Sequence, residues 1–308
     1  MTGIGYGIQL PIQAQSPVFA DEWESAAGVA ELVPVTQAAE AAGLFYVAVC
    51  DHIAIPRSKA EAMGTTWYDT VATLSYLAGI TYRIGLMSHV AVPVYRHPLQ
   101  TAKQWTTLDA LSGGRTILGV GAGHVEGEFD ALGLDFASRG AVVDEAIDAL
   151  RAAFADEFSS HHGDVWSYDD MGIRPRPVQA RIPIWVGGST PAAIRRAALR
   201  GDGWLPQGPP PDGMAGGIAR LQALREEAGR AEEPFVVGAL SGPMYVGRPS
   251  WDVGRTVVGP PERLAKYLQG LVDVGVEQIQ VRFMSRDAAE LCDQLAAFGA
   301  EVMPLVGC

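Results

Sequence analysis

The sequence predicts one α/β domain over residues 1–308, a closed (β/α)8 TIM barrel with inserted loops at its C-terminal mouth. Eight apolar strand patterns alternate with eight helical patterns, which is the order of elements in such a barrel. The 36 glycines and 20 prolines are scattered, as many short βα turns require. No linker-like change of composition divides the chain, which disfavours the competing arrangement, an open doubly wound sheet in two domains.

The segment 83–123 is the clearest βα repeat of the series. Its first apolar run, residues 84–90, has the composition of a strand that is covered on both faces. Pro98 suits the first turn of a helix, where its missing N–H costs nothing. The helix ends at residues 112–114 (Ser-Gly-Gly), because glycine adopts left-handed dihedrals without a steric penalty. A second apolar run, residues 116–120, completes a right-handed parallel β-α-β unit.

The same patterns place the other elements along the chain. The remaining strands are expected at residues 3–10, 44–50, 182–186, 202–206, 235–246 and 277–283. The remaining helices are expected at residues 32–42, 70–80, 142–154, 191–200, 213–228, 260–274 and 288–298. Residues 126–139 are expected to form a long loop. Residues 159–179 are expected to hold a short hairpin and part of an active-site cover.

Charge and composition limit the class of protein. A formal net charge of −12 argues against a nucleic-acid partner, which needs an excess of Lys and Arg, and it disfavours an anionic membrane. No segment reaches about 18 consecutive apolar residues, so no membrane span is expected. The N-terminus lacks the basic region of a secretion signal. The three cysteines have neither a disulfide framework nor metal spacing, which favours the cytoplasm.

Asp51 and His52 directly follow the buried strand at residues 44–50. In a parallel barrel the carboxyl ends of the strands carry the chemistry, and an imidazole there can exchange a proton near neutral pH. His52 is therefore the candidate catalytic residue, although a lone histidine can also be structural. Asp51 either raises the pKa of His52 or caps a local turn. The histidines show no metal spacing, so no metal site is expected.

Two glycine-rich segments follow other strands. Residues 119–123 (Gly-Val-Gly-Ala-Gly) are incomplete as a dinucleotide fingerprint, since no helix begins at once. They indicate either a strand end where a ring or phosphate approaches the backbone, or a plain turn. Residues 187–191 (Gly-Gly-Ser-Thr-Pro) place two amides, two hydroxyls and a helix N-terminus at one point, which favours a phosphate. Simple N-capping by Ser189 or Thr190 is the alternative.

Several of these segments together resemble the bacterial luciferase-like superfamily. The matching segments are Val47-x-x-Cys50-Asp51-His52, Arg96-His97-Pro98-Leu99, Leu108-Asp109-x-Leu111-Ser112-Gly113-Gly114-Arg115, Gly119-Val120-Gly121-Ala122-Gly123, Ile182-Pro183-Ile184-Trp185-Val186-Gly187-Gly188, Asp202-Gly203-Trp204 and Gly259-x-Pro261-Glu262. Their order and spacing cover nearly the whole chain. Within the superfamily the chain is most similar to oxidoreductases that use the deazaflavin coenzyme F420.

The resemblance implies a cofactor ring at the barrel mouth, with a non-proline cis peptide between Ser88 and His89 beneath it. The residues it assigns to the cofactor are Asp51, His52, Ser88, His89, Gly121, Ala122, Gly123 and His124 around the ring and ribityl chain, and Gly187, Gly188 and Ser189 at the phosphate. His52 would lie beside the reactive carbon. Deazaflavin-dependent sugar-phosphate dehydrogenases carry Trp where this chain has Pro56 and Glu where it has His124, so a sugar phosphate is not implied as the substrate.

We therefore expect an F420-dependent oxidoreductase that transfers a hydride between C5 of the deazaflavin and a small organic substrate, with His52 handling the proton. The alternatives are an FMN-dependent monooxygenase that uses reduced flavin, and a non-catalytic flavin-binding barrel. The loops at residues 53–67, 125–138 and 159–179 are expected to line the mouth and to determine the substrate.

The sequence also suggests a homodimer. Apolar residues occur beyond one face of the helices expected at residues 70–80 and 98–111, which indicates a second surface to bury. These residues are Tyr76, Leu77, Trp105 and Leu108.

Overall fold

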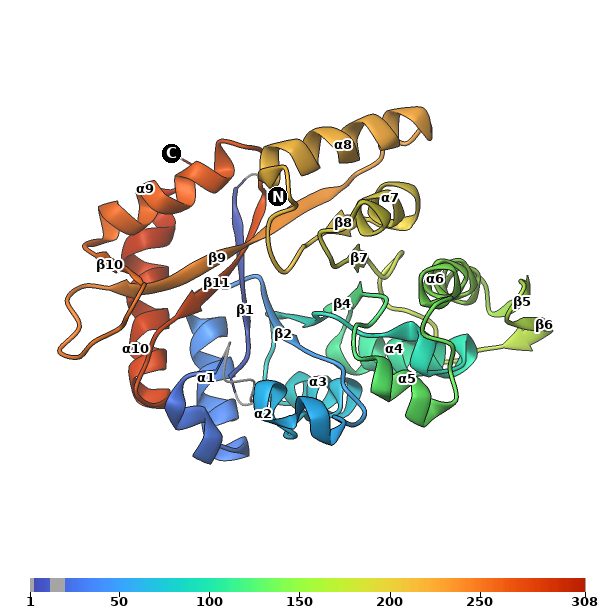
Figure 1. Cartoon of the computed structure of the whole chain (residues 1–308), viewed down its shortest axis with the longest axis horizontal. Coiled ribbons are helices and arrows are strands. Elements are labelled where there is room, and N and C mark those ends of the chain that lie inside the picture. The colour runs from blue at the N-terminus through green and yellow to red at the C-terminus, as the bar shows by residue number, and fades with distance from the viewer. Residues whose placement is uncertain (1–2, 12–19, 308) are drawn as a thin grey trace.

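A computed structural model describes residues 3–11 and 20–307, and eight of its strands close into a parallel barrel (Figure 1). The barrel strands are β1 (Gly5–Gln9), β2 (Tyr46–Val49), β3 (Gly85–Ser88), β4 (Thr116–Val120), β7 (Ile184–Val186), β8 (Gly203–Trp204), β9 (Val236–Val246) and β11 (Gln278–Phe283). Neighbours pair in parallel, and the pairings of β8 with β9 and of β11 with β1 close the ring. The predicted (β/α)8 barrel is confirmed, and the open doubly wound sheet is wrong.

A helix follows each barrel strand and covers the outside of the barrel (Figure 1). These helices are α1 (Val29–Ala41), α3 (Thr70–Ala78), α4 (Pro98–Ser112), α6 (Arg139–Ala155), α7 (Pro191–Arg200), α8 (Gly213–Glu227), α9 (Pro261–Val272) and α10 (Ala288–Ala297). The local signals act as predicted at α4, which begins at Pro98 and ends at Gly113 with a left-handed φ of 69°. No helix within the described ranges is long and apolar enough to cross a membrane.

Two apolar cores hold the barrel together, because successive side chains of a strand point to opposite faces. The inner core contains Tyr46, Ala48, Met87, Ile117, Trp185 and Leu205. The outer core joins strands to helices, and β2 supplies Val47 and Val49 to it. The barrel interior below the mouth is therefore packed with side chains and forms a rigid base for the strand ends.

Three segments differ from the expected elements. Residues 126–139 are not one loop, because α5 (Glu126–Leu132) forms there and ends at Gly133 with φ of 70°. A short helix α2 (Ala60–Met63) interrupts the loop after β2. The strand β10 (Val257–Gly259) was not predicted, and it pairs with the end of β9.

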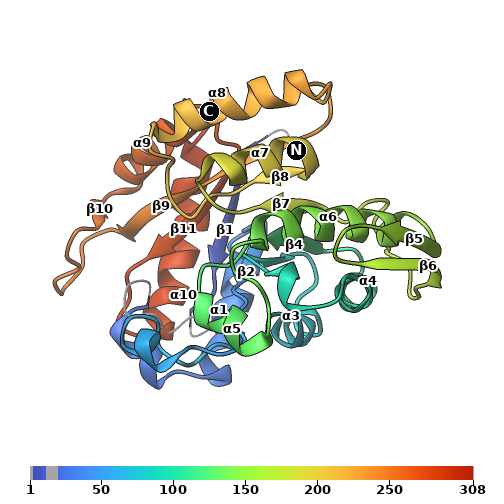
Figure 2. The same cartoon turned by 45° about the vertical axis from the view of Figure 1, so that its right-hand side comes forward.

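The hairpin predicted within residues 159–179 is confirmed as β5 (Phe158–His162) and β6 (Ser167–Gly172). It lies at the outer edge of the molecule in both views, beside α6 (Figure 2). The Tyr168 hydroxyl donates to the Ala149 carbonyl of α6 at 3.3 Å. The prediction that this segment covers the active site is wrong, because none of its residues lines the cavity at the carboxyl ends of the barrel strands.

The residues that suggested a homodimer are mostly internal. Leu77, Trp105 and Leu108 are buried within the chain itself, whereas Tyr76 is 47% exposed. Their apolar character is thus explained by packing of α3 and α4 on the barrel. The homodimer remains a prediction, for which the exposed Tyr76, Tyr82 and Leu111 are the apolar side chains available near these helices.

Candidate active site

A cavity of about 650 Å³ opens at the carboxyl ends of the barrel strands, and we call it the first cavity. Most of the residues predicted to bind the cofactor line this cavity. The predicted residues that line it are Asp51, His52, His89, Gly121, Ala122, Gly123, His124, Gly187 and Gly188. They converge because the carboxyl ends of parallel strands meet at one face of a barrel. The loop at residues 53–67 also contributes to the wall through Ala62, Met63 and Trp67.

Two predicted residues, Ser88 and Ser189, do not line the first cavity. Ser88 is fully buried and its Oγ donates to the Gly119 carbonyl at 2.7 Å. Ser189 Oγ donates to the Gly208 carbonyl at 2.7 Å. The neighbouring Thr190 does line the cavity, and its Oγ1 caps α7 by accepting from the Ala193 amide at 3.2 Å. The serine hydroxyls therefore connect neighbouring strand ends.

A non-proline cis peptide joins His89 to Val90, one residue later than the predicted Ser88–His89 bond. The predicted position is wrong because the parallel hydrogen bonding of β3 to β2 continues through His89. The His89 amide donates to the Val49 carbonyl at 2.7 Å. The side chain of Val90 then enters the first cavity. A Cβ at Gly121 or at Gly187 would lie 2.6 Å from a Val90 methyl carbon. These two glycines therefore make room for Val90 in the cavity wall.

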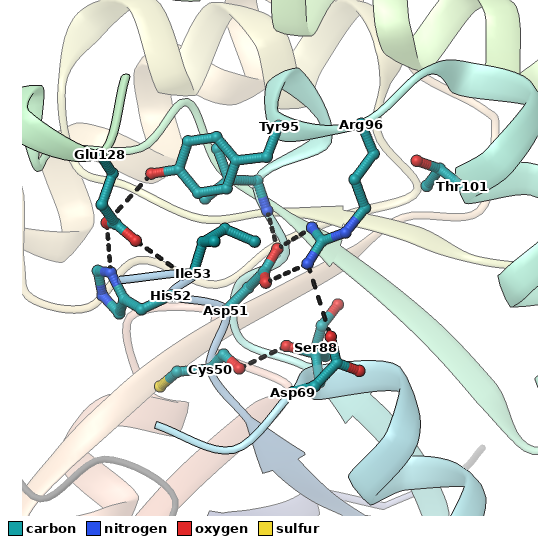
Figure 3. A network of polar contacts seen from close by, with 12 residues as sticks. Cys50, Asp51, His52, Ile53, Asp69, Ser88, Tyr95, Arg96, Thr101 and Glu128 are labelled. Carbon is teal, nitrogen blue, oxygen red and sulfur yellow. Dashed lines mark hydrogen bonds and ion pairs between the residues drawn. The ribbon is translucent and has the colours of Figure 1, made fainter. Parts of the chain in front are cut away.

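The Asp51 carboxylate is held by Arg96 and caps no local turn (Figure 3). The two guanidinium nitrogens donate to the two carboxylate oxygens at 2.7 and 2.9 Å. The Val92 amide also donates to Asp51 Oδ2 at 2.9 Å. The Asp51 side chain is 2% exposed, so this is a buried, bidentate ion pair that ties the end of β2 to the segment after β3.

The partner of His52 is Glu128, which comes from α5 (Figure 3). His52 Nδ1 lies 2.7 Å from Glu128 Oε2, so Nδ1 carries the proton and donates it. The other oxygen, Oε1, accepts from the amides of Ile53 at 2.7 Å and Ala54 at 3.2 Å. The Tyr95 hydroxyl donates to Oε2 at 3.3 Å. Four donors thus surround one carboxylate, which fixes the imidazole that it faces.

The environment keeps Glu128 ionised. Burial alone raises the pKa of this carboxyl, but the hydrogen bond and charge of His52 and the two amide donors outweigh it and lower the pKa below the ordinary 4.5. A carboxylate that stays charged favours the proton on His52 Nδ1. The other ring nitrogen, Nε2, is then the atom that remains for a proton from a bound molecule.

Two further rings surround His52. The Trp67 indole lies edge-on to it, with ring centroids 4.2 Å apart, and the His124 ring lies at 5.6 Å. Burial and the nearby charge of His52 lower the pKa of His124. Trp67 thus brings an indole to the histidine from the loop after β2.

His89 is a buried neutral imidazole in the wall of the first cavity. Burial lowers its pKa to about 4. Its Nε2 lies 3.1 Å from the Leu205 carbonyl and therefore carries the proton, since a carbonyl only accepts. Nδ1 of His89 and Nε1 of Trp67 are buried polar atoms without a hydrogen-bond partner among the described residues. Both belong to residues that line the cavity, where a bound heterocycle would satisfy them.

Two arginines, Arg139 of α6 and Arg196 of α7, line the first cavity together with Gly187, Gly188 and Thr190. Arg196 is paired with Asp144 at 2.5 Å, and the Arg139 guanidinium lies 3.7 Å from the centre of the Phe136 ring. Positive charge beside the N-terminus of α7 suits the phosphate of a cofactor. The sequence patterns pointed to the glycines of this end but not to the arginines, which lie on α6 and α7.

We expect Glu128→Gln to lower kcat about 10- to 100-fold with little change in KM or in cofactor affinity. A glutamine keeps the size but replaces one acceptor oxygen by an NH2 group, so one of the donors around residue 128 loses its partner. Steady-state kinetics and cofactor titration measure the separation. Equal losses in kcat and cofactor affinity would contradict a positioning role for Glu128.

The pH dependence of stability gives a second measurement on the same pair of proteins. The folded-state pKa of Glu128 is lowered. Its contribution to the free energy of unfolding is therefore fully present above about pH 4.5 and is lost as the pH falls through the folded-state pKa. The unfolding free energies of the wild type and Glu128→Gln should therefore converge on acidification below about pH 4.5. A constant difference across that range would contradict the assignment of the ionised carboxylate.

The fold and the cavity define a (β/α)8-barrel protein with a cavity at the C-terminal mouth. The chain matches the family model for luciferase-like monooxygenases over residues 7–270. It belongs to this luciferase-like family of oxidoreductases and monooxygenases, as the resemblance of its motifs predicted.

Two relatives illustrate the range of the family. An uncharacterized protein of Mycobacterium tuberculosis is 35% identical over 221 residues, which cover 68% of this chain and 76% of the relative. An F420-dependent glucose-6-phosphate dehydrogenase of Intrasporangium calvum is 32% identical over 196 residues, which cover 59% of this chain and 56% of the relative.

Solved structures with the same fold use either cofactor type. An F420-dependent secondary alcohol dehydrogenase in complex with an F420–acetone adduct has a TM-score of 0.79 at 17% identity, covering 99% of this chain and 100% of its own. A riboflavin lyase with modified FMN has a TM-score of 0.79 at 14% identity, covering 98% of this chain and 91% of its own. At these identities the likeness concerns the fold alone.

Proposed function

We propose that this protein is an F420-dependent oxidoreductase that transfers a hydride between deazaflavin C5 and a small organic substrate. The observation that carries the proposal is the His52–Glu128 pair in the wall of a cavity large enough for a tricyclic ring. The F420-dependent dehydrogenase among the relatives supports the choice of deazaflavin. The cytoplasmic location and the homodimer inferred from the sequence remain predictions.

The residues of the first cavity fit such a cofactor. Val90 and the glycines at 121 and 187 form a wall without large side chains, against which a flat ring can lie. Nδ1 of His89 and Nε1 of Trp67 offer one acceptor and one donor to a heterocycle. Arg139 and the N-terminus of α7 favour a phosphate at the other end of the cavity.

The roles of the protein groups follow from this arrangement. Bound deazaflavin supplies hydride exchange at C5. His52 Nε2 accepts a proton from the substrate, or returns it in the reverse direction, while Nδ1 stays bound to Glu128. Glu128 stabilises the positive charge that His52 then carries. The Asp51–Arg96 pair fixes the backbone that leads into His52.

We expect the protein to bind F420 at least tenfold more tightly than FMN. Fluorescence quenching during titration of the purified protein with each cofactor measures both dissociation constants. Turnover of the bound, reduced cofactor with and without oxygen then separates a dehydrogenase or reductase from a monooxygenase. A tenfold preference for FMN would reassign the protein to the FMN-dependent monooxygenases. Binding without turnover of any substrate in a broad panel would favour the non-catalytic barrel.

A further inference from the structure

A cavity of about 560 Å³ lies at the amino ends of the barrel strands, at the opposite end of the barrel from the first cavity. Its lining includes the first residues of β3, β4 and β9, which are Gly85, Thr116 and Val236, and we call it the basal cavity. It shares no lining residue with the first cavity, because the packed inner core lies between them. A molecule in the basal cavity would therefore not touch a cofactor at the mouth.

The walls of the basal cavity are aromatic and aliphatic. Ile117 and Trp185 of the inner core line it, and Phe45 and Val236 line it while packing against that core. The first residue of β3 is Gly85, which places no side chain in this space. Aromatic side chains around a cavity of this size fit the faces and edges of a flat, fused ring system.

Both carboxylates in the wall of the basal cavity are already paired with arginines. The charged residues that line it are Arg83, Arg115, Arg181, Asp202 and Glu233. Asp202 pairs with Arg181 at 2.7 Å and also with Arg151. Glu233 pairs with Arg230 at 2.7 Å. These two carboxylates therefore offer little attraction to a bound cation and little repulsion to a bound anion.

Arg115 adds a positive charge that is only partly compensated. Its guanidinium donates to neutral acceptors, which are the Thr81 hydroxyl and the carbonyls of Ala78, Thr81, Ile84 and Ser112, at 2.7–3.1 Å. Burial lowers the pKa of Arg115, and the charge of Glu40 opposes this shift only in part. All five N–H groups of Arg115 are used, so it attracts an anion by charge without donating to it.

Arg83 is the arginine of this lining that has free donors. Its side chain is exposed, and within the described ranges it makes no hydrogen bond and no ion pair. Glu40 acts on Arg83 by charge at longer range, and Glu40 Oε1 accepts from the amides of residues 82–84. Arg83 and Arg115 together outweigh the single charge of Glu40. A free guanidinium presents two parallel N–H groups, which match the two oxygens of a planar carboxylate.

We propose that the basal cavity binds a small aromatic carboxylate, with its rings against Phe45, Ile117 and Trp185 and its carboxylate bonded to Arg83. The rings fill the apolar space below the inner core, and the charge is held where the guanidinium meets solvent. This site is additional to the proposed oxidoreductase site and does not depend on it, since the two cavities have separate linings.

Three probes with one fused ring system and different charges test the proposal: 2-naphthoate, 2-naphthol and 2-naphthylmethylammonium. The reporter is the Ile117 methyl signal in the ¹³C–¹H NMR spectrum of the full chain labelled at isoleucine methyls, assigned with Ile117→Val. Ile117 lines the basal cavity, and no isoleucine of the described residues lines the first cavity. We expect 2-naphthoate to shift this signal saturably and to bind about tenfold or more tightly than 2-naphthylmethylammonium, with 2-naphthol between them. An unshifted Ile117 signal, or equal affinities for the three probes, would overturn the proposal.

Arg83→Gln should weaken 2-naphthoate about three- to fivefold and leave 2-naphthol within about twofold, which is the size of effect that one partly exposed ion pair gives. The control is Arg255→Gln, which removes the same charge from an exposed position beyond the carboxyl end of β9. It should leave the affinity of all three probes within about twofold, because salt screens a charge that distant. Equal affinities for 2-naphthoate in these two variants would contradict the role of Arg83.

Val236→Trp fills the cavity from its wall and should abolish the Ile117 shift with every probe. Thermal unfolding shows whether each variant is folded. A folded Val236→Trp protein that still binds 2-naphthoate with native affinity would place the probe elsewhere and overturn the proposal. If Val236→Trp does not fold, the comparison of Arg83→Gln with Arg255→Gln decides the question.

Discussion

Replacement of His52 by alanine is expected to lower kcat at least about 100-fold, because a positioned general acid–base group contributes about 10²- to 10⁴-fold to the rate. The side chain is 10% exposed and lies in the wall of the first cavity, with Nδ1 bound to Glu128. Cofactor affinity should change little, since Arg139, Gly187 and Gly188 remain in place. Steady-state kinetics and cofactor titration of the variant measure the two effects separately.

The matched variant is His52→Asn, which keeps a polar side chain of similar reach that can still donate to Glu128. It should retain the cavity and lose the proton transfer, so its kcat should resemble that of the alanine variant. An alanine variant with native kcat and weakened cofactor binding would mean that His52 is an anchor. His124, whose ring lies 5.6 Å from that of His52, would then be the next candidate for the base.

Most of the fold could be predicted because its signals are local. The strand at residues 116–120 is a short run of mostly apolar residues, and α4 carries both a start signal at Pro98 and a stop signal at Gly113. The helix α5 was missed because it is only seven residues long and buries a single large apolar side chain, Phe129. The signal that could have found it is the glycine at 133, which ends the helix with a left-handed φ.

The candidate site was predictable only where it depends on strand ends. His52, His89 and the glycines at 121 and 187 converge because parallel strands all end at one face of the barrel. The contact between His52 and Glu128 spans 76 positions of the chain, and it depends on how α5 returns to the mouth. No spacing rule encodes such a contact, and the same holds for Trp67.

The two acidic residues near His52 have different roles, and the sequence alone did not show which of them contacts the imidazole. Asp51 is the immediate neighbour in the chain, yet its carboxylate points to Arg96 and shapes the backbone (Figure 3). Glu128 is distant in the chain, yet its carboxylate faces the imidazole. Adjacent residues at a strand end point in different directions, so proximity in sequence was a poor guide to the partner of His52.

Arg96→Ala is expected to lower the free energy of unfolding by about 3–5 kcal/mol, which is the usual cost of leaving a buried charge without its partner. Asp51 would keep the Val92 amide as a donor but lose both guanidinium bonds, and its side chain is only 2% exposed. Urea unfolding of the apoprotein measures the change. Arg96→Lys should recover part of this loss, since an ammonium restores the charge but not the two parallel hydrogen bonds.

The control is Arg220→Ala on α8, which removes an ion pair to Asp212. The Arg220 and Asp212 side chains are 44% and 39% exposed, so this substitution should cost at most about 1 kcal/mol. A loss at Arg96 no larger than that at Arg220 would show that Asp51 is stabilised by other means, and that the end of β2 holds His52 in place without this ion pair.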